Sequence, residues 1–160
     1  MNVFDILGPV MIGPSSSHTA GAARIGRITL ALLGSPAVKA DIFLHGSFAK
    51  TYKGHGTDKA LIAGIMGMST DDSRIRRAPE LAREQGLAVT ITTGDIDGAH
   101  PNTARVALTD ADGNRVSLLG SSIGGGNILV TEVNGMEVSI TGQHTTLIVL
   151  HRDAPGTIAA

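Results

Sequence analysis

Side chains that could bind an anion and move a proton are concentrated in residues 13–19, which read GPSSSHT. The three serines follow a Gly-Pro pair and precede a long apolar stretch, so we expect them to cap a helix that runs to Leu33. A helix N-terminus has unpaired backbone N–H groups and the positive end of the helix dipole, so it readily binds a carboxylate or a phosphate. His18 adds an imidazole to this turn. A plain helix cap with spare serines is the alternative interpretation.

A second histidine, His55, stands between two glycines in KGHGTD at residues 53–58. Glycines on both sides remove side-chain bulk and allow a ligand to approach the backbone. A neutral imidazole with an ordinary pKa of about 6.5 can accept a proton at physiological pH. The pattern is therefore typical of a catalytic base, although a flexible turn with an exposed histidine would have the same sequence.

Two later loops carry polar groups or an unusual number of glycines. His100 and Asn102 lie in DGAHPNT at residues 97–103, and three consecutive glycines lie in SSIGGGN at residues 121–127. The glycine run lacks the Gly-Lys-Ser/Thr of a P-loop and leads into a predicted strand, so we interpret it as a site of close backbone contact with a ligand or another chain. The remaining histidines lack such settings and are interpreted as packed or surface residues: His45, His144 and His151.

The histidines do not indicate a metal site by themselves. His18, His55 and His100 could in principle offer three nitrogens, but they form no helical i, i+4 pair and no HExxH pattern is present. The chain also contains no cysteine, so it can neither form disulfides nor supply thiolates to an iron-sulfur cluster. Any cluster chemistry would therefore need ligands from another polypeptide.

The composition of the 160 residues narrows the classes of partner. Apolar residues make up 42%, charged residues 17%, and the formal net charge is -1, which indicates a globular domain without a nucleic-acid footprint. Aromatic residues are only 2%, too few for base-stacking platforms. No signal peptide and no long apolar run are present in the sequence. We therefore expect a cytoplasmic protein that binds a small molecule or another protein, and neither nucleic acid nor membrane.

The predicted elements indicate a single α+β domain with a mostly antiparallel sheet flanked by helices. Helices are expected up to Leu33, from Thr57 to Met68 and over 79–85, and strands over 38–45, 87–93, 104–109, 115–119, 127–133 and 136–141. Asn134-Gly135 is the strongest hairpin signal, and the loop at 110–114 predicts another hairpin. Consecutive hairpins in the second half of the chain favour antiparallel pairing over a doubly wound parallel sheet.

The last residues have the pattern of a further domain that is just beginning. Residues 145–151 (TTLIVLH) predict a strand, and a Pro-Gly turn and the start of a helix follow it. No C-cap closes that helix. We therefore expect residues 1–150 to form one domain and residues 151–160 to open a second domain whose remainder is missing.

Four motifs in order resemble the beta chain of iron-sulfur-dependent L-serine dehydratases: GPSSSHT, KGHGTD, HPNTAR and SSIGGGNI. The ending HRDAPGTIA is similar to the opening of the regulatory ACT domain that follows the beta region in this family. The resemblance implies that a separate alpha chain holds a 4Fe-4S cluster, whose open iron acts as the Lewis acid. It also implies a β-elimination that converts L-serine to pyruvate and ammonia without pyridoxal phosphate.

The resemblance also assigns roles to individual residues. His55 would be the general base for the α-proton, and His18 would act beside it. The substrate-binding residues would be Ser15, Ser16, Ser17, His18, His100, Asn102, Gly124, Gly125 and Gly126. The isolated piece is expected to form a homodimer, because a surface that meets a partner retains exposed apolar area. The preference between serine and threonine and the effector of the ACT domain stay open.

The beta region of this family also resembles the allosteric substrate-binding domain of D-3-phosphoglycerate dehydrogenase, and the same fold is expected here. In that setting the module would bind an anionic effector and catalyse nothing. The basic residues that could form such a patch are Arg24, Arg27, Arg74, Arg76 and Arg77. The two histidines in glycine-rich or serine-rich surroundings favour the lyase, because an effector module would not require them.

Overall fold

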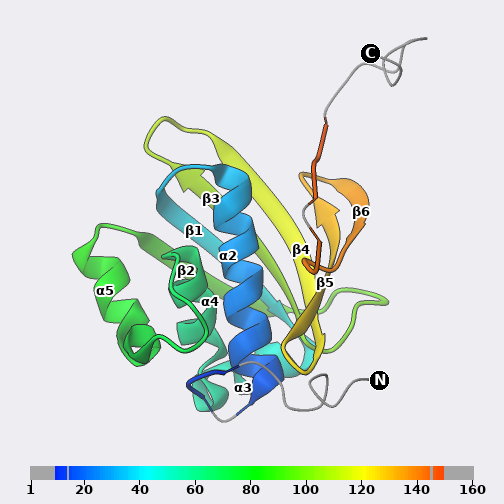
Figure 1. Cartoon of the computed structure of the whole chain (residues 1–160), viewed down its shortest axis with the longest axis horizontal. Helices are drawn as coiled ribbons and strands as arrows, with labels where there is room; N and C mark the ends of the chain where they lie inside the picture. The colour runs from blue at the N-terminus through cyan, green and yellow to red at the C-terminus, as the bar shows by residue number, and fades with distance from the viewer. Residues whose placement is uncertain (1–9, 14, 145, 150–160) are drawn as a thin grey trace.

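A mixed six-stranded sheet forms the framework of the molecule (Figure 1). The computed structural model describes residues 10–13, 15–144 and 146–149. The strands are β1 (Ala37–His45), β2 (Ala88–Gly94), β3 (Thr103–Asp110), β4 (Arg115–Gly124), β5 (Asn127–Val133) and β6 (Met136–Ile140). Their order across the sheet is β2-β1-β3-β4-β5-β6, with β1 and β2 parallel and the other neighbours antiparallel.

Helical segments fill the first half of the chain and the crossover between the two parallel strands. They are the π-helix η1 (Ser16–Gly21), α2 (Ala22–Leu33), α3 (Gly46–His55), α4 (Thr57–Ile65), the 3-10 helix η2 (Ser73–Arg77) and α5 (Ala78–Glu84). η1 continues directly into α2, so the two form one helical rod. α2 and α4 lie side by side against the sheet, and α5 lies beyond β2 at the edge of the molecule (Figure 1).

The packing of α2 on α4 depends on two glycines. A Cβ atom at Gly26 would lie 2.4 Å from the carbonyl oxygen of Leu61, and one at Gly64 would lie 2.1 Å from that of Ala23. Both distances are far below van der Waals contact, so only glycine permits this helix separation. The close approach buries the aliphatic side chains that join the helices to the sheet, among them Ile25 and Leu61, which are 0% exposed.

The predicted fold class is confirmed, and its hairpins lie where the turn residues indicated them. β3 pairs with β4 across the loop at 110–114, and β5 pairs with β6 around Asn134-Gly135. Asn134 has φ 50 and Gly135 has φ 81, which is the left-handed backbone that a two-residue hairpin turn requires. The mostly antiparallel sheet follows from these local signals.

The strand predicted over 115–119 extends to Gly124 in β4, and three other segments also differ from the prediction. Residues 46–55, where no helix was predicted, form α3, and the helix expected to reach Met68 ends at Ile65. A strand was predicted over 145–151, but residues 146–149 have no regular secondary structure, and 145, 150 and 151 lie outside the described residues. The second domain expected to begin at 151–160 also lies outside them.

Asp110 closes the β3–β4 hairpin and anchors the loop between α2 and β1. Its carboxylate accepts hydrogen bonds from Ser35 Oγ at 2.6 Å, from Asn114 Nδ2 and N at 2.8 Å, and from Asp112 N at 3.0 Å. The hydrogen bonds from Ser35 and then Asn114 lower the pKa of Asp110 from 3.8 to about 2. The charged form is therefore favoured by folding.

The sign of this pKa shift predicts an acid-dependent loss of stability. The contribution of Asp110 is fully present above pH 3.8 and is lost as the pH falls towards about 2. Asp110→Asn should therefore lower the melting temperature by several degrees at neutral pH, and the difference from the wild type should shrink towards pH 2. Melting curves measured across this pH range test the prediction. An equal difference at every pH would contradict it.

Candidate active site

His18 lies in the π-helical turn that opens the rod of η1 and α2. Ser15 is the N-cap, and its side-chain oxygen accepts a hydrogen bond from the backbone N of His18 at 3.3 Å. Single π-helical turns occur frequently at functional sites, because the wider turn redirects side chains that an α-helix would place elsewhere. Here the turn directs His18 into the protein, where only 8% of the residue is exposed.

Both ring nitrogens of His18 face hydroxyl groups. Nδ1 lies 3.3 Å from Ser15 Oγ, and Nε2 lies 3.3 Å from Ser47 Oγ. Ser47 is in turn fixed in the first turn of α3, because its backbone N donates to the carbonyl of Pro101 at 2.7 Å. Burial, and secondarily the charge of His55, lower the pKa of His18 below 6.5. His18 is therefore neutral at neutral pH and held in one orientation.

His55 is the last residue of α3, at the end opposite Ser47, and its side chain lies next to that of His18. The two imidazole rings meet edge to face, with centroids 4.9 Å apart and an interplanar angle of 88°. Gly56, with φ 72, ends α3 directly after His55, which leaves the imidazole at an exposed helix terminus. Its side chain has no hydrogen-bond partner among the described residues. The pair thus combines a buried, oriented histidine with an accessible one.

A hollow of about 540 Å³ opens beside His55. Four segments surround it, and its lining residues are Ile12, Gly13, Thr19, Lys53, Gly54, His55, Gly56, Lys59, Ile75 and Arg76. The hollow therefore lies between the end of α3, the start of α4, the π-helical turn and η2. A ligand in it would contact His55 and lie next to the turn that carries His18.

His100 and Asn102 lie on the loop before β3 and are tied to the site only indirectly. His100 Nδ1 accepts from the backbone N of Asn102 at 3.1 Å, and Pro101 between them holds Ser47. The imidazole of His100 lines a separate cavity of about 450 Å³. Leu119 of β4 also lines that cavity. Its neighbour Leu118 faces the core, and successive side chains of a strand point to opposite faces, so the cavity lies on the sheet face opposite α2.

The three-glycine run ends β4 at Gly124 and forms the tight turn to β5 with Gly125 and Gly126. Gly124, Gly125 and Gly126 have φ values of 103, 60 and 78, so each needs the backbone freedom of glycine. Arg24 of α2 donates from Nη1 to the carbonyl of Gly126 at 2.8 Å. The turn is thereby fixed to the helix that continues from η1.

Sequence reasoning missed Ser47, which the structure places on His18 Nε2. No local signal marks it, because SFAKTYK after Gly46 has neither a clear amphipathic pattern nor a capping side chain. Ser16 and Ser17 are half-buried in the first turn of η1, where helix geometry leaves backbone N–H groups without intrahelical partners. The predicted serines and histidines 18 and 55 thus come together, whereas His100 does not join them.

The donor set of this chain does not fit a metal cluster. In the described part of the chain no three His, Cys, Asp or Glu side chains are grouped so that they could hold a metal ion. The whole sequence contains no cysteine. Any iron-sulfur cluster that acts with these residues must therefore have its thiolate ligands outside this sequence.

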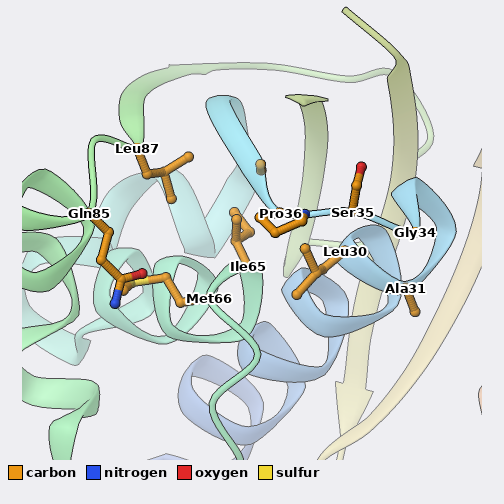
Figure 2. Close-up of a pocket in the computed structure, with 10 residues that line it drawn as sticks. Leu30, Ala31, Gly34, Ser35, Pro36, Ile65, Met66, Gln85 and Leu87 are labelled. Atoms are coloured by element: carbon orange, nitrogen blue, oxygen red, sulfur yellow. The ribbon is translucent and has the colours of Figure 1, made fainter. Parts of the chain in front are cut away.

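A third cavity, of about 560 Å³, lies at the C-terminal ends of α2 and α4 (Figure 2). Leu30, Ile65, Met66 and Leu87 point into it, and none of its lining residues carries a titratable side chain. It can hold apolar groups but cannot transfer a proton. The hollow at His55 is therefore the better candidate for catalysis.

Comparison with known proteins identifies relatives that match nearly the whole chain. The family model for the serine dehydratase beta chain matches residues 2–94. The probable L-serine dehydratase beta chain of Bacillus subtilis is 49% identical over 158 residues, which cover 99% of this chain and 71% of that protein. The L-serine dehydratase beta chain of Peptoniphilus asaccharolyticus is 39% identical, with 99% and 72% covered.

A more distant relative is the L-serine dehydratase TdcG of Escherichia coli, which is 31% identical over 159 residues that cover 85% of this chain and 35% of that protein. The family match and the two beta-chain relatives together cover nearly the whole chain. The chain belongs to the serine dehydratase beta chain family. Within its described residues no helix is both long and apolar enough to cross a membrane.

Proposed function

We propose that this chain supplies one part of the active site of an L-serine ammonia-lyase. The reaction breaks the Cα–H and Cβ–O bonds of L-serine and releases water. The resulting aminoacrylate tautomerises to an imine, which water hydrolyses to pyruvate and ammonia. The observation that carries the proposal is the buried, oriented His18 in edge-to-face contact with an accessible His55 at the opening of a hollow. The names of the relatives support the choice of L-serine.

The remainder of the active site is proposed to come from an alpha chain. The word beta chain in the names of two relatives supports a second type of subunit. A 4Fe-4S cluster, the cofactor that the resemblance implies, would be held entirely by cysteines of that alpha chain, because this chain has none. The expected homodimer and cytoplasmic location stay predictions.

The residues around His18 are proposed to hold the substrate carboxylate. Ser15, Ser16 and Ser17 form the first turn of the helical rod, where backbone N–H groups and the helix dipole favour a negative charge. His18 is neutral at neutral pH, because burial lowers its pKa. A neutral imidazole between two hydroxyls donates to one and accepts from the other, so His18 can orient Ser15 and Ser47 toward the substrate without bringing a fixed charge into the site.

His55 is proposed to take the α-proton. It is exposed, and its ring contacts His18 but forms no hydrogen bond within the described residues. A ring nitrogen is thus available to a substrate that His18 and the serines hold nearby. The loop of Asn102, whose neighbour Pro101 holds Ser47, and the glycine turn at 124–126 would border this site, where they would meet substrate or the alpha chain, whereas His100 would act from its separate cavity.

The proposal that two chains share one active site predicts the outcome of a mixing experiment. This chain alone should form no pyruvate from L-serine, and activity should appear when anaerobically reconstituted alpha chain is added and should saturate as the two chains reach equal concentration. A coupled pyruvate assay measures both. Pyruvate formation by this chain alone would contradict the proposal, and so would an alpha chain whose activity does not change on addition of this chain.

A further inference from the structure

The hollow beside His55 carries an unbalanced positive charge. Lys53 on the last turn of α3, Lys59 on the first turn of α4 and Arg76 on η2 all line it, and among the described residues no acidic side chain does. Within the described residues none of the three forms an ion pair, whereas Arg74, two residues before Arg76, is neutralised by Asp72 at 2.6 Å. Three unpaired cations in one concave surface attract negative charge.

The nearest interactions do not cancel this charge. Lys53 Nζ lies 5.7 Å from the ring centroid of Tyr52, a contact that stabilises a cation but does not neutralise it. Asp58 is close in sequence, but it accepts a hydrogen bond from the backbone N of Lys59 and does not line the hollow. The hydroxyl of Thr19, a lining residue that is 2% exposed, has no hydrogen-bond partner among the described residues. That hydroxyl is itself buried, so what the hollow offers a ligand is its positive charge.

The amino-acid substrate does not account for these cations. L-serine is a zwitterion, so three positive side chains that attract its carboxylate would also repel its ammonium group. The hollow, at about 540 Å³, has the volume of a site for a much larger ligand. Lys53, Lys59 and Arg76 are all exposed, so they form the surface that an approaching protein meets first.

We propose that this hollow is the docking site for an acidic segment of the alpha chain, whose carboxylates pair with Lys53, Lys59 and Arg76. The inference rests on the proposed function, because it requires an alpha chain. His55 lines the same hollow, so docking there brings the alpha chain against the proposed base. Pairing of these charges would mainly set the rate at which the two chains associate and the register in which they meet. The total buried area would matter less for both.

The test compares two double variants that remove the same charge from the same elements. Lys53→Gln/Arg76→Gln removes two cations that line the hollow, and Lys50→Gln/Arg77→Gln removes two exposed cations of α3 and η2 that do not. The affinity of each full-length chain for the alpha chain is measured by calorimetry at low and high ionic strength. The hollow variant should bind about tenfold more weakly at low ionic strength, and this difference should shrink as salt screens the charges.

A charge-conserving variant, Lys53→Arg/Arg76→Lys, separates charge from shape and should bind like the wild type. Equal affinity of the hollow variant and the wild type would overturn the docking site and leave the proposed function intact. An equal loss in both Gln variants would overturn it as well, because net charge alone would then explain binding. A wild-type chain that does not bind the alpha chain at all would instead overturn the proposed function, and the inference with it.

Discussion

His55→Ala is expected to lower kcat/KM for pyruvate formation by about 100-fold or more in the mixture with alpha chain, the range for loss of a general base. His55 is the accessible member of the histidine pair, and its ring nitrogens have no hydrogen-bond partner among the described residues. Alanine removes the proton acceptor but leaves the serine turn and the orientation of His18 by Ser15 and Ser47 in place. Initial rates over a range of L-serine concentrations give the parameter.

The control for this experiment is His144→Ala. His144 is an exposed histidine after β6, and it does not line the hollow. Its replacement should leave kcat/KM unchanged. Full activity of His55→Ala would show that the proton acceptor lies elsewhere, and an equal loss in His144→Ala would show that the assay reports a general effect of removing a histidine.

Gly64→Ala is expected to destabilise the fold by about 1–3 kcal/mol, the usual cost of forcing an extra methyl group into a packed core. The new Cβ would lie 2.1 Å from the carbonyl oxygen of Ala23 and 3.0 Å from the backbone N of Arg27. Backbone atoms cannot rotate away as a side chain can, so α2 and α4 must separate. Denaturant unfolding measures the loss as a lower midpoint.

Gly54→Ala provides a matched control for the same substitution in a helix. Nothing lies within 4 Å of a Cβ atom at Gly54, so alanine meets no obstacle there. It should stabilise the chain by about 0.5–1 kcal/mol, because alanine favours a helix more than glycine does. If both variants had the same stability, close contact between α2 and α4 would not be the reason for glycine at position 64.

The hairpins of the second half of the chain could be predicted because their signals are local. Asn134-Gly135 specifies its turn through the backbone conformations that these two residues accept. The helix α3 could not be predicted in the same way. It begins at Gly46 with φ 57, contains Gly54 and buries only Phe48, so packing rather than propensity determines it.

The candidate site shows the same division between local and long-range information. Serine caps and histidines beside glycines identified residues 15–18 and 55 from the sequence, because capping and loop chemistry are local. That His18 contacts His55 depends on the whole of α3, which was not predicted. Ser47, the π-helical turn and the position of His100 in a separate cavity likewise follow from tertiary packing.

Chemical rescue tests the role of His55 most directly. Pyruvate formation by His55→Ala with alpha chain is measured as imidazole is added, with His18→Ala in parallel. Because His55 is exposed and His18 is buried, imidazole should restore a concentration-dependent part of the rate to His55→Ala and none to His18→Ala. A low rate in His55→Ala that imidazole leaves unchanged would contradict the assignment of His55 as the base.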